Sequence, residues 1–514
     1  SRSISCNFTH DFKSRKNFTF EGSNTQLIIV VPQFEETYFK CIEFIDCVVC
    51  GLVLPGQQDI STELYEKIAQ SFNKSSLQSL KNKNYLVCIY YKKLDQFKLA
   101  GDAWNSINCF YRVYREGLIF SNSLIELVNS NSKASLNSGS IADYLCWTTL
   151  SGQKTFFENV NSIKPRSSIE VQFAKEQNTF VTNQKIFHLY PKHTHATEQD
   201  VNEEFLKNTS NYYLSMENLK SHNIGMFLSG GNDSSLVAAL FKDHVKNNAL
   251  YASNVHHANW PNNDTPWFIK AVQQLHLTGQ VFYSDFEQYS KYYYESVSAT
   301  AYPSIAFAAS LFGLITQSNE IFGLHAYLNG TGPDEAMVGL RHSDIELTIK
   351  MCKEQESKMQ NREKLAMFLV EQMAVSYVDK EEIVSLFNNS PDELALNVER
   401  LKIALEIIDE SENISVLDIQ RRFSFETTTI DHIKMFNQYT NANNSVSFYP
   451  YLTDASFELT FSTNFNSLSD MLSIKKPVKS ALAKYFDSNF IHRPKIGFHN
   501  PFNRYLVENK GILS

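Results

Sequence analysis

One stretch constrains the fold of this chain more than any other, the segment Asn223–Phe241 with the sequence NIGMFLSGGNDSSLVAALF. An apolar run typical of a buried strand leads into a Ser-Gly-Gly turn, which is followed by residues that open a helix. Glycine has no Cβ, so the backbone can turn sharply and approach a bulky anion. The N–H groups and the positive dipole end of the helix would face that anion. The pattern predicts a phosphate-binding loop formed by Ser229, Gly230, Gly231, Asn232, Asp233, Ser234 and Ser235.

This loop is not a Walker loop, because the GxxxxGK(S/T) spacing and its lysine are absent. Asp233 places a carboxylate beside the phosphates, where Mg²⁺ would bind. We also expect the N–H groups of Ser234 and Ser235 to start the helix and to be unpaired.

Strands and helices alternate after this loop, which predicts a parallel sheet with crossover helices. Ligands of such sheets lie at the carboxyl ends of the strands. The loop is therefore expected at the site, together with the end of the second strand, whose backbone could bind adenine. The predicted strands are 224–228, 250–257 and 280–284, and the predicted helices are 234–246 and 266–275, the latter capped by Asp264.

The chain has 514 residues, which predicts two domains. The part before residue 197 shows a run of short antiparallel strand patterns with a few helices, so we divide the chain into 1–196, an α+β layered domain, and 197–514. A net charge of −8 argues against nucleic acid as a partner. No apolar run approaches the roughly 18 residues of a membrane span. The eight cysteines stand mostly in apolar strand patterns, which predicts buried free thiols and a cytoplasmic location.

The loop SGGNDSS resembles the SGGxDS loop of the ATP-pyrophosphatase superfamily, whose members cleave ATP between the α- and β-phosphates and adenylate a substrate. The stretch AYLNGTGPDEAMVGL at 326–340 is similar to the SGEGADELFGG loop of class B asparagine synthetases. This resemblance implies that Gly330 and Gly332 bind pyrophosphate. It further implies that Asp334 holds Mg²⁺ together with Asp233.

The stretch KKPVKSALAKYFDSNFIHRPKIGFHNP at 475–501 is similar to the K-x-x-L-R…R-x-K-x-G-F…P pattern of the same family. The resemblance implies that Lys479 belongs to the ATP-binding and pyrophosphate-binding residues. It also implies that Lys495 is catalytic and stabilises the charge on the acyl-adenylate and on the departing phosphate.

The segments GDAWNSINCFYRVYREGLIFSNS and KTFFENVNSIKP resemble the glutaminase domain of class B asparagine synthetases. The family's nucleophile is an N-terminal cysteine, whereas residue 1 here is Ser and Cys6 is internal. We therefore expect an Ntn-type, glutaminase-like domain without its catalytic cysteine, which acts as a scaffold. Exposure of Cys6 by processing is the alternative.

Thr331 departs from the family pattern. Asparagine synthetases carry Glu at this position, β-lactam and carbapenam synthetases carry Tyr, and some lasso peptide cyclases carry His. Threonine cannot act as a base at neutral pH, so His325 and His342 remain candidates for that role. Asn232 also departs from the pattern, because its position in the loop is usually hydrophobic.

The resemblance implies a ligase that uses ATP and Mg²⁺, adenylates a carboxylate with release of pyrophosphate, and forms an amide with release of AMP. We expect an intramolecular amide on a peptide or small molecule that bears a carboxylate and an amine. The favoured branch is a lasso peptide macrolactam synthetase of antibiotic biosynthesis, with a maturation protease or leader-binding protein as partner. The alternatives are a cyclase of the β-lactam synthetase type, an amidotransferase that uses free ammonia, and a non-catalytic nucleotide-binding homologue.

Overall fold

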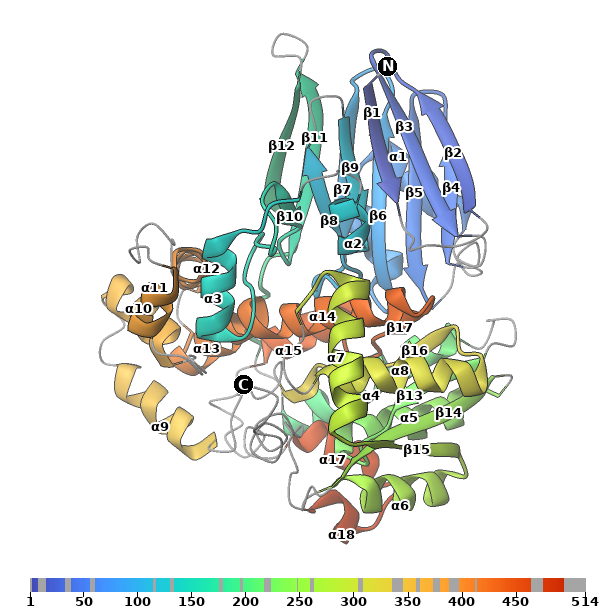
Figure 1. The fold of residues 1–514 in the computed structure, drawn as a ribbon, viewed down its shortest axis with the longest axis vertical. Helices are drawn as coiled ribbons and strands as arrows, with labels where there is room; N and C mark the ends of the chain where they lie inside the picture. The colour runs from blue at the N-terminus through green and yellow to red at the C-terminus, as the bar shows by residue number, and fades with distance from the viewer. Residues whose placement is uncertain are drawn as a thin grey trace.

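The computed structural model describes residues 2–7, 15–32, 38–55, 61–113, 117–129, 134–174, 179–194, 197–216, 223–246, 248–258, 263–303, 308–334, 345–356, 361–372, 380–387, 397–411, 414–463 and 475–493. These residues form three sheets, two in the N-terminal half and one in the C-terminal half (Figure 1).

The two N-terminal sheets have six strands each, in the orders β10-β8-β9-β1-β3-β2 and β12-β11-β7-β6-β5-β4. The strands of the first sheet are β1 (Arg2–Asn7), β2 (Arg15–Glu21), β3 (Thr25–Pro32), β8 (Phe110–Val113), β9 (Gly117–Ser121) and β10 (Val160–Ser162). The strands of the second are β4 (Phe39–Glu43), β5 (Cys47–Leu54), β6 (Asn84–Tyr91), β7 (Gln96–Gly101), β11 (Ser167–Ala174) and β12 (Thr179–Ile186).

The two sheets pack face to face, as the rings of Phe97 on β7 and Phe120 on β9 show at a centroid distance of 5.0 Å. The other face of the second sheet is covered by α1 (Thr62–Gln70) and η2 (Lys74–Leu80). Strand β5 is buried along its whole length because it is covered on both faces. We refer to this half as the two-sheet part.

The predicted antiparallel strands between residues 85 and 123 do pair antiparallel, β6 with β7 and β8 with β9, but the two pairs belong to different sheets. Strand β1, which was not predicted from the sequence, pairs in parallel with both β3 and β9. Cys6 lies inside β1, opposite Ile29 and Phe120, so processing in front of it would remove most of this central strand.

The third sheet has five strands in the order β15-β14-β13-β16-β17, and all of its pairs are parallel. Its strands are β13 (Asn223–Phe227), β14 (Ala249–His257), β15 (Thr278–Ser284), β16 (Ala326–Leu328) and β17 (Val446–Phe448). The prediction of a parallel sheet is confirmed. Strand β17 was not predicted, because its three residues are too few for a period to be visible.

Helices cover both faces of this sheet, because alternate side chains of each strand point to opposite sides. On one face lie α4 (Glu198–Leu214), α5 (Asn232–His244), α6 (Thr265–Leu275) and α17 (Lys476–Leu482); on the other lie α7 (Phe286–Thr300), α8 (Ala308–Phe322) and α14 (Ile430–Ala442). Ile224 and Met226 face α5, whereas Phe227 and Tyr327 stack on each other towards α14. We refer to this half as the parallel-sheet part.

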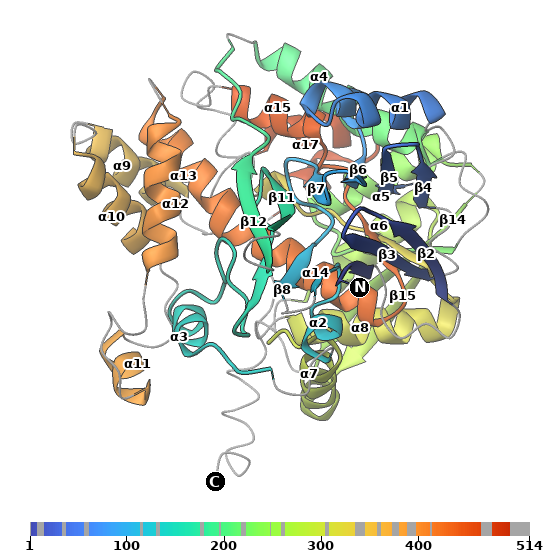
Figure 2. The same ribbon diagram turned by 90° about the horizontal axis from the view of Figure 1, so that it is seen from above.

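The remaining helices are mostly outside these layers. Figure 2 shows α9 to α13 gathered to one side of the molecule. The full set of remaining helices is α2 (Leu124–Asn129), α3 (Ser138–Trp147), α9 (Ile345–Glu356), α10 (Arg362–Gln372), α11 (Lys380–Phe387), α12 (Val398–Asp409), α13 (Val416–Ser424), the π-helical turn η4 (Phe425–Thr429), α15 (Asp454–Ser462) and α18 (Ser488–Ile491). None of the helices within the described ranges is long and apolar enough to cross a membrane.

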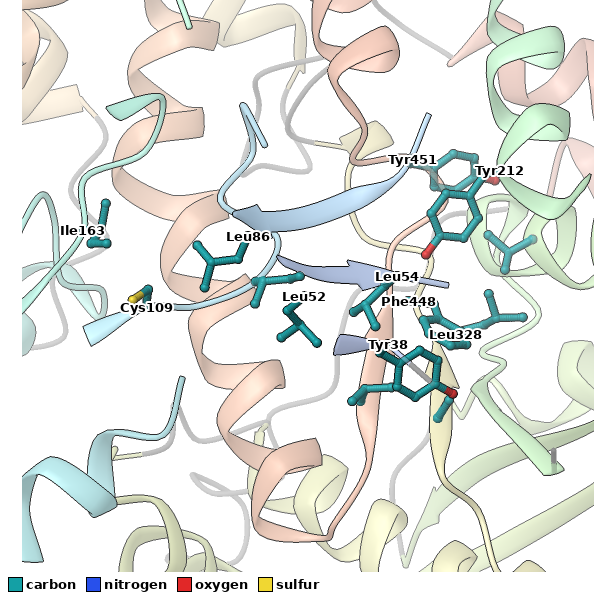
Figure 3. Packing of buried hydrophobic residues seen from close by; sticks show 14 of the residues in the cluster. Tyr38, Leu52, Leu54, Leu86, Cys109, Ile163, Tyr212, Leu328, Phe448 and Tyr451 are labelled. Carbon is teal, nitrogen blue, oxygen red and sulfur yellow. The ribbon is translucent and has the colours of Figure 1, made fainter. Parts of the chain in front are cut away.

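The two parts share one hydrophobic core. Figure 3 shows Leu52 and Leu86 of the second sheet in the same cluster as Leu328 and Phe448 of the parallel sheet. Buried hydrogen bonds add to this contact, and they centre on the start of α15. The Asp454 carboxylate accepts hydrogen bonds from the Tyr85 hydroxyl at 2.7 Å and from the Ala103 N–H at 2.8 Å. The two parts are therefore fixed against each other.

The cysteines differ in part from the expectation. Cys47, Cys88, Cys109, Cys146 and Cys352 are buried free thiols, as expected. Cys41 and Cys50, by contrast, lie opposite each other on β4 and β5 and form a disulfide. The two cysteines are nine positions apart in the sequence, and the antiparallel register of β4 with β5 brings them opposite each other.

Candidate active site

The phosphate-loop candidate lies at the carboxyl end of β13, between this strand and α5. Gly230 has a φ of 73°, and a Cβ at this position would lie 2.4 Å from the carbonyl carbon of Trp267. Only glycine fits such a position without strain. The Ser229 hydroxyl accepts a hydrogen bond from the Gly231 N–H at 3.1 Å, which closes the turn.

Helix α5 begins at Asn232, two residues before the predicted start. The N–H of Ser235 donates to the Gly231 carbonyl at 2.9 Å, so the expectation that this group is unpaired is wrong. The first turn of the helix instead comprises Asn232, Asp233 and Ser234, and these residues bring the helix N-terminus to the loop. The Ser234 hydroxyl donates to the Gly231 carbonyl at 3.2 Å.

The second predicted loop directly contacts the first. A Cβ at Gly330 would lie 3.1 Å from both the N and Cα atoms of Ser234, so the two backbones meet at this glycine. The parallel pairing of β13 with β16 brings both loops to the same edge of the sheet. Gly332 follows with a φ of 132°. Glu335, Gly339 and His342 lie outside the described residues.

Thr331 is held by its neighbour. The Asn329 side-chain oxygen accepts hydrogen bonds from the Thr331 N–H at 2.9 Å and from its hydroxyl at 2.6 Å. His325 lies at the amino end of β16, at the opposite end of the strand from Thr331. The hypothesis that His325 replaces the base at position 331 is therefore wrong.

The carboxylates of Asp233 and Asp334 meet at one cation, the side-chain ammonium of Lys475. The Lys475 Nζ lies 2.6 Å from Asp233 Oδ2 and 2.5 Å from Asp334 Oδ1. Burial alone would lower the pKa of Lys475, but the two carboxylates outweigh it and hold the pKa above its ordinary value. The ammonium is therefore charged at neutral pH.

Sequence reasoning missed Lys475 and chose Lys479. Lys475 stands at the N-cap of α17, in a lysine-rich run where no periodic pattern marks one lysine over another. The K-x-x-L-R pattern fits Lys479, which has Leu482 three residues later, and not Lys475, so the pattern itself directed the prediction to the wrong lysine. Lys479 lies one helical turn later, and burial together with the Lys475 charge lowers its pKa.

This arrangement fits Mg²⁺. In the part of the chain that the structure describes, no three or more His, Cys, Asp or Glu side chains gather at a metal site. Magnesium, however, is commonly held by one or two carboxylates together with substrate phosphates and water. Asp233 and Asp334 already bind one positive charge together, the Lys475 ammonium, so their carboxylates are close enough to share a cation.

Arg493 reaches the phosphate loop from the C-terminal side. Arg493 lies close to the Gly231 backbone, because its Nη2 is 3.5 Å from the position that a Cβ at Gly231 would take. Its Nη1 lies 3.5 Å from Asp264 Oδ1. Its guanidinium lies 5.1 Å from the centroid of the Trp267 ring. Burial raises the pKa of Asp264 to about 6, although Arg493 acts in the opposite direction. Asp264 stands at the N-cap position of α6, as predicted, but its side chain makes no capping hydrogen bond and pairs with Arg493 instead. Lys495 lies outside the described residues.

Two further contacts surround the loop. The Tyr451 hydroxyl donates to the Asp233 main-chain carbonyl at 3.0 Å. No sequence pattern predicts this contact. Within β14, the Asn254 amide donates to the Leu228 carbonyl at 3.0 Å. This bond places the second half of β14 beside the residue that leads into the loop.

One family model matches more than half of the chain. Residues 217–511 match the family model described as Asparagine synthase. Similar solved structures include NMN synthetase from Francisella tularensis, with 14% identity over 39% of this chain and 91% of that chain and a TM-score of 0.21. NH3-dependent NAD synthetase from Campylobacter jejuni has 14% identity over 40% of this chain and 94% of that chain, with a TM-score of 0.21. U34-tRNA thiolase NcsA from Methanococcus maripaludis has 15% identity over 43% of this chain and 79% of that chain, with a TM-score of 0.22. No curated protein matches the chain.

Proposed function

Because this chain belongs to the asparagine synthase family of ATP-using synthetases, we propose that it adenylates a carboxylate and joins it to an amine of the same substrate. The convergence of Asp233 and Asp334 on one cation position carries this proposal. Two carboxylates from two contacting loops, at the carboxyl edge of a parallel sheet, form a site suited to a metal-bound triphosphate.

In this proposal the loop from Ser229 to Ser235 binds the β- and γ-phosphates, and Gly330 and Gly332 complete the pyrophosphate site. The first turn of α5 directs N–H groups towards negative charge. Lys475 and Lys479 add positive charge beside it. Asp233 and Asp334 would hold Mg²⁺, which supplies neutralisation of the phosphate oxygens when it is bound.

The reaction has two steps. In the first, a carboxylate oxygen forms a bond to the α-phosphorus, and the bond between the α-phosphorus and the bridging oxygen breaks, so that pyrophosphate leaves towards the loop. In the second, the amine nitrogen bonds to the acyl carbon, the bond from that carbon to the phosphate oxygen breaks, and AMP leaves. The amine gives up its proton in this step. Lys495, by the family resemblance, stabilises the charge that develops in both.

Thr331 supports an amine other than glutamine-derived ammonia. The Thr331 hydroxyl donates a hydrogen bond to the side-chain oxygen of Asn329, so the position where asparagine synthetases carry Glu offers no base here. We therefore propose an intramolecular amide on a peptide, as in lasso peptide macrolactam synthetases. A maturation protease or leader-binding protein is the partner that such a substrate implies.

We propose that the two-sheet part, residues 1–196, is a glutaminase-like domain that acts as a scaffold for residues 197–514. The shared core and the buried Asp454 contacts support this role. An interface of this kind holds its neighbour in place without any chemistry of its own.

Exchange of radiolabelled pyrophosphate into ATP tests the adenylation step. We expect exchange that depends on a peptide with a free Asp or Glu side chain, and that falls at least a hundredfold in Asp233→Asn. Asp409→Asn is the control, because Asp409 is an exposed carboxylate on α12 that pairs with Arg362. Absence of exchange with every carboxylate, together with unchanged behaviour of Asp233→Asn, would support a non-catalytic protein.

Mass spectrometry of the product tests the second step. Loss of one water from the peptide with release of AMP supports ring closure. A product one mass unit lighter that appears only with added ammonia supports amidation. Activity on a small β-amino acid rather than a peptide would favour a cyclase of the β-lactam synthetase type.

A further inference from the structure

Asn232, the residue that departs from the family loop, connects the phosphate loop to a distant part of the chain. Its side-chain Nδ2 donates a hydrogen bond of 3.0 Å to the main-chain carbonyl of Ile491. Ile491 ends α18, and Arg493 follows two residues later. We call residues 475–493 the C-terminal arm.

The arm lies along α5 and α6 and makes further polar contacts with them. Lys270 pairs with Asp487 at 3.0 Å, and the Gln274 amide donates to the Tyr485 carbonyl at 3.2 Å. These two contacts are exposed, so each contributes little to stability.

The contacts at the phosphate loop are of a different kind, because they are largely buried. Ile491 is 5% exposed, and the Arg493 side chain is 6% exposed. Arg493 pairs with Asp264 and lies against Gly231, one residue before Asn232. The end of the arm therefore meets the loop at two neighbouring residues, through a hydrogen bond at Asn232 and through the close approach of Arg493 to Gly231.

Packing does not explain an asparagine at position 232. The Asn232 Oδ1 is buried and has no hydrogen-bond partner, which is energetically unfavourable. A hydrophobic side chain at this position would carry no such unpaired acceptor. The amide N–H bond to Ile491 is thus the contribution that a hydrophobic residue cannot supply.

We propose that Asn232 is a positioning residue that couples the phosphate loop to the C-terminal arm. Asn232 is the first residue of α5, so its backbone belongs to the helix end that faces the phosphates while its side chain holds the arm. Any change of the loop on nucleotide binding is transmitted to the arm, and the coupling is reciprocal. The kinetic consequence rests on the proposed function, whereas the link between loop and arm does not.

Hydrogen–deuterium exchange of the arm tests the coupling. We expect Asn232→Leu to raise amide exchange of residues 486–493 about fivefold, and to abolish the protection that a non-hydrolysable ATP analogue gives these amides in the wild type. Asn232→Asp, which keeps the shape but cannot donate, should behave in the same way. The matched control is Asn223→Leu, because Asn223 donates a similar 2.7 Å bond to the Phe322 carbonyl at the other end of β13. It should leave the arm unchanged.

Kinetics test the consequence. In Asn232→Leu we expect kcat for pyrophosphate exchange to fall at least tenfold, with the KM for ATP within twofold of wild type. A rise in KM for ATP with unchanged exchange in the arm would overturn the proposal, since Asn232 would then act on the nucleotide alone. Unchanged arm exchange in both Asn232 variants would also overturn it. If wild type shows no pyrophosphate exchange, the proposed function fails, but the deuterium measurement still decides the coupling.

Discussion

Replacement of Lys475 by methionine removes the cation on which Asp233 and Asp334 converge. Each carboxylate lies within 2.6 Å of the same nitrogen, so the two bound oxygens are within about 5 Å of each other. Two like charges at this distance repel by about 3 kcal/mol at an effective dielectric constant of about 20. Since the Asp334 side chain is 35% exposed, solvent reduces this repulsion. We expect Lys475→Met to destabilise the nucleotide-free protein by about 2 kcal/mol.

Thermal denaturation with and without Mg²⁺, in the absence of nucleotide, measures this effect. We expect the Tm of Lys475→Met to lie several degrees below wild type and to recover in millimolar Mg²⁺, because a divalent cation can then bind both carboxylates. Wild type should respond little, since the ammonium already occupies that position. Mn²⁺ binding followed by electron paramagnetic resonance should show a site in the variant without nucleotide, and in wild type only with it.

The neighbouring lysine provides the control. Lys476 pairs with Glu198 at 3.1 Å, outside the site, so Lys476→Met should lower the Tm slightly and show no response to Mg²⁺. If Lys475→Met has the same Tm as wild type and is equally insensitive to Mg²⁺, the two carboxylates do not share a cation position. The metal assignment of Asp233 and Asp334 would then be wrong.

Three other perturbations test the local geometry. Gly230→Ala should weaken binding of an ATP analogue more than tenfold by calorimetry, because a Cβ would lie 2.4 Å from the Trp267 backbone; Gly323→Ala, with a φ of 60° and open space, should not. The pKa of Asp264 is raised from 3.8 to about 6, so the stability it contributes is present below pH 4 and is lost as pH rises through 6. The Tm of wild type should therefore fall relative to that of Asp264→Asn between pH 4 and 7; a constant difference would contradict the raised pKa. Asp454→Ala leaves two buried donors unpaired and should destabilise the protein by about 3 kcal/mol in thermal denaturation, more than Asp454→Asn.

The elements around the phosphate loop could be predicted from sequence because their signals are local. Strand β13 and helix α5 lie within two residues of their predicted bounds, since an apolar run, a glycine turn and a helix opening follow one another directly. The meeting of the Asp233 and Asp334 loops also followed from a general rule, because parallel strands present their carboxyl ends at one edge.

The features that could not be predicted depend on contacts between distant segments. Lys475 differs from other lysines of its run only in facing two carboxylates that lie 242 and 141 residues earlier in the chain. Asp264 has the sequence signature of a helix cap, yet Arg493 competes for its carboxylate. The parallel pairing of β1 with β3 and β9 could not be predicted, because side chains alternate in the same way along parallel and antiparallel strands.

The phosphate loop depends on the two-sheet part through one segment of the chain. The side chain of Asn84, at the start of β6, donates to the Leu452 carbonyl at 2.6 Å and accepts from the Tyr449 N–H at 3.1 Å. Between these two residues stands Tyr451, whose hydroxyl donates to the Asp233 carbonyl. The segment that supports Asp233 is thus itself held by the N-terminal half. Loss of that half would leave Tyr449 and Leu452 with unpaired main-chain groups, so we expect the parallel-sheet part to lose the support of the loop when it is produced alone.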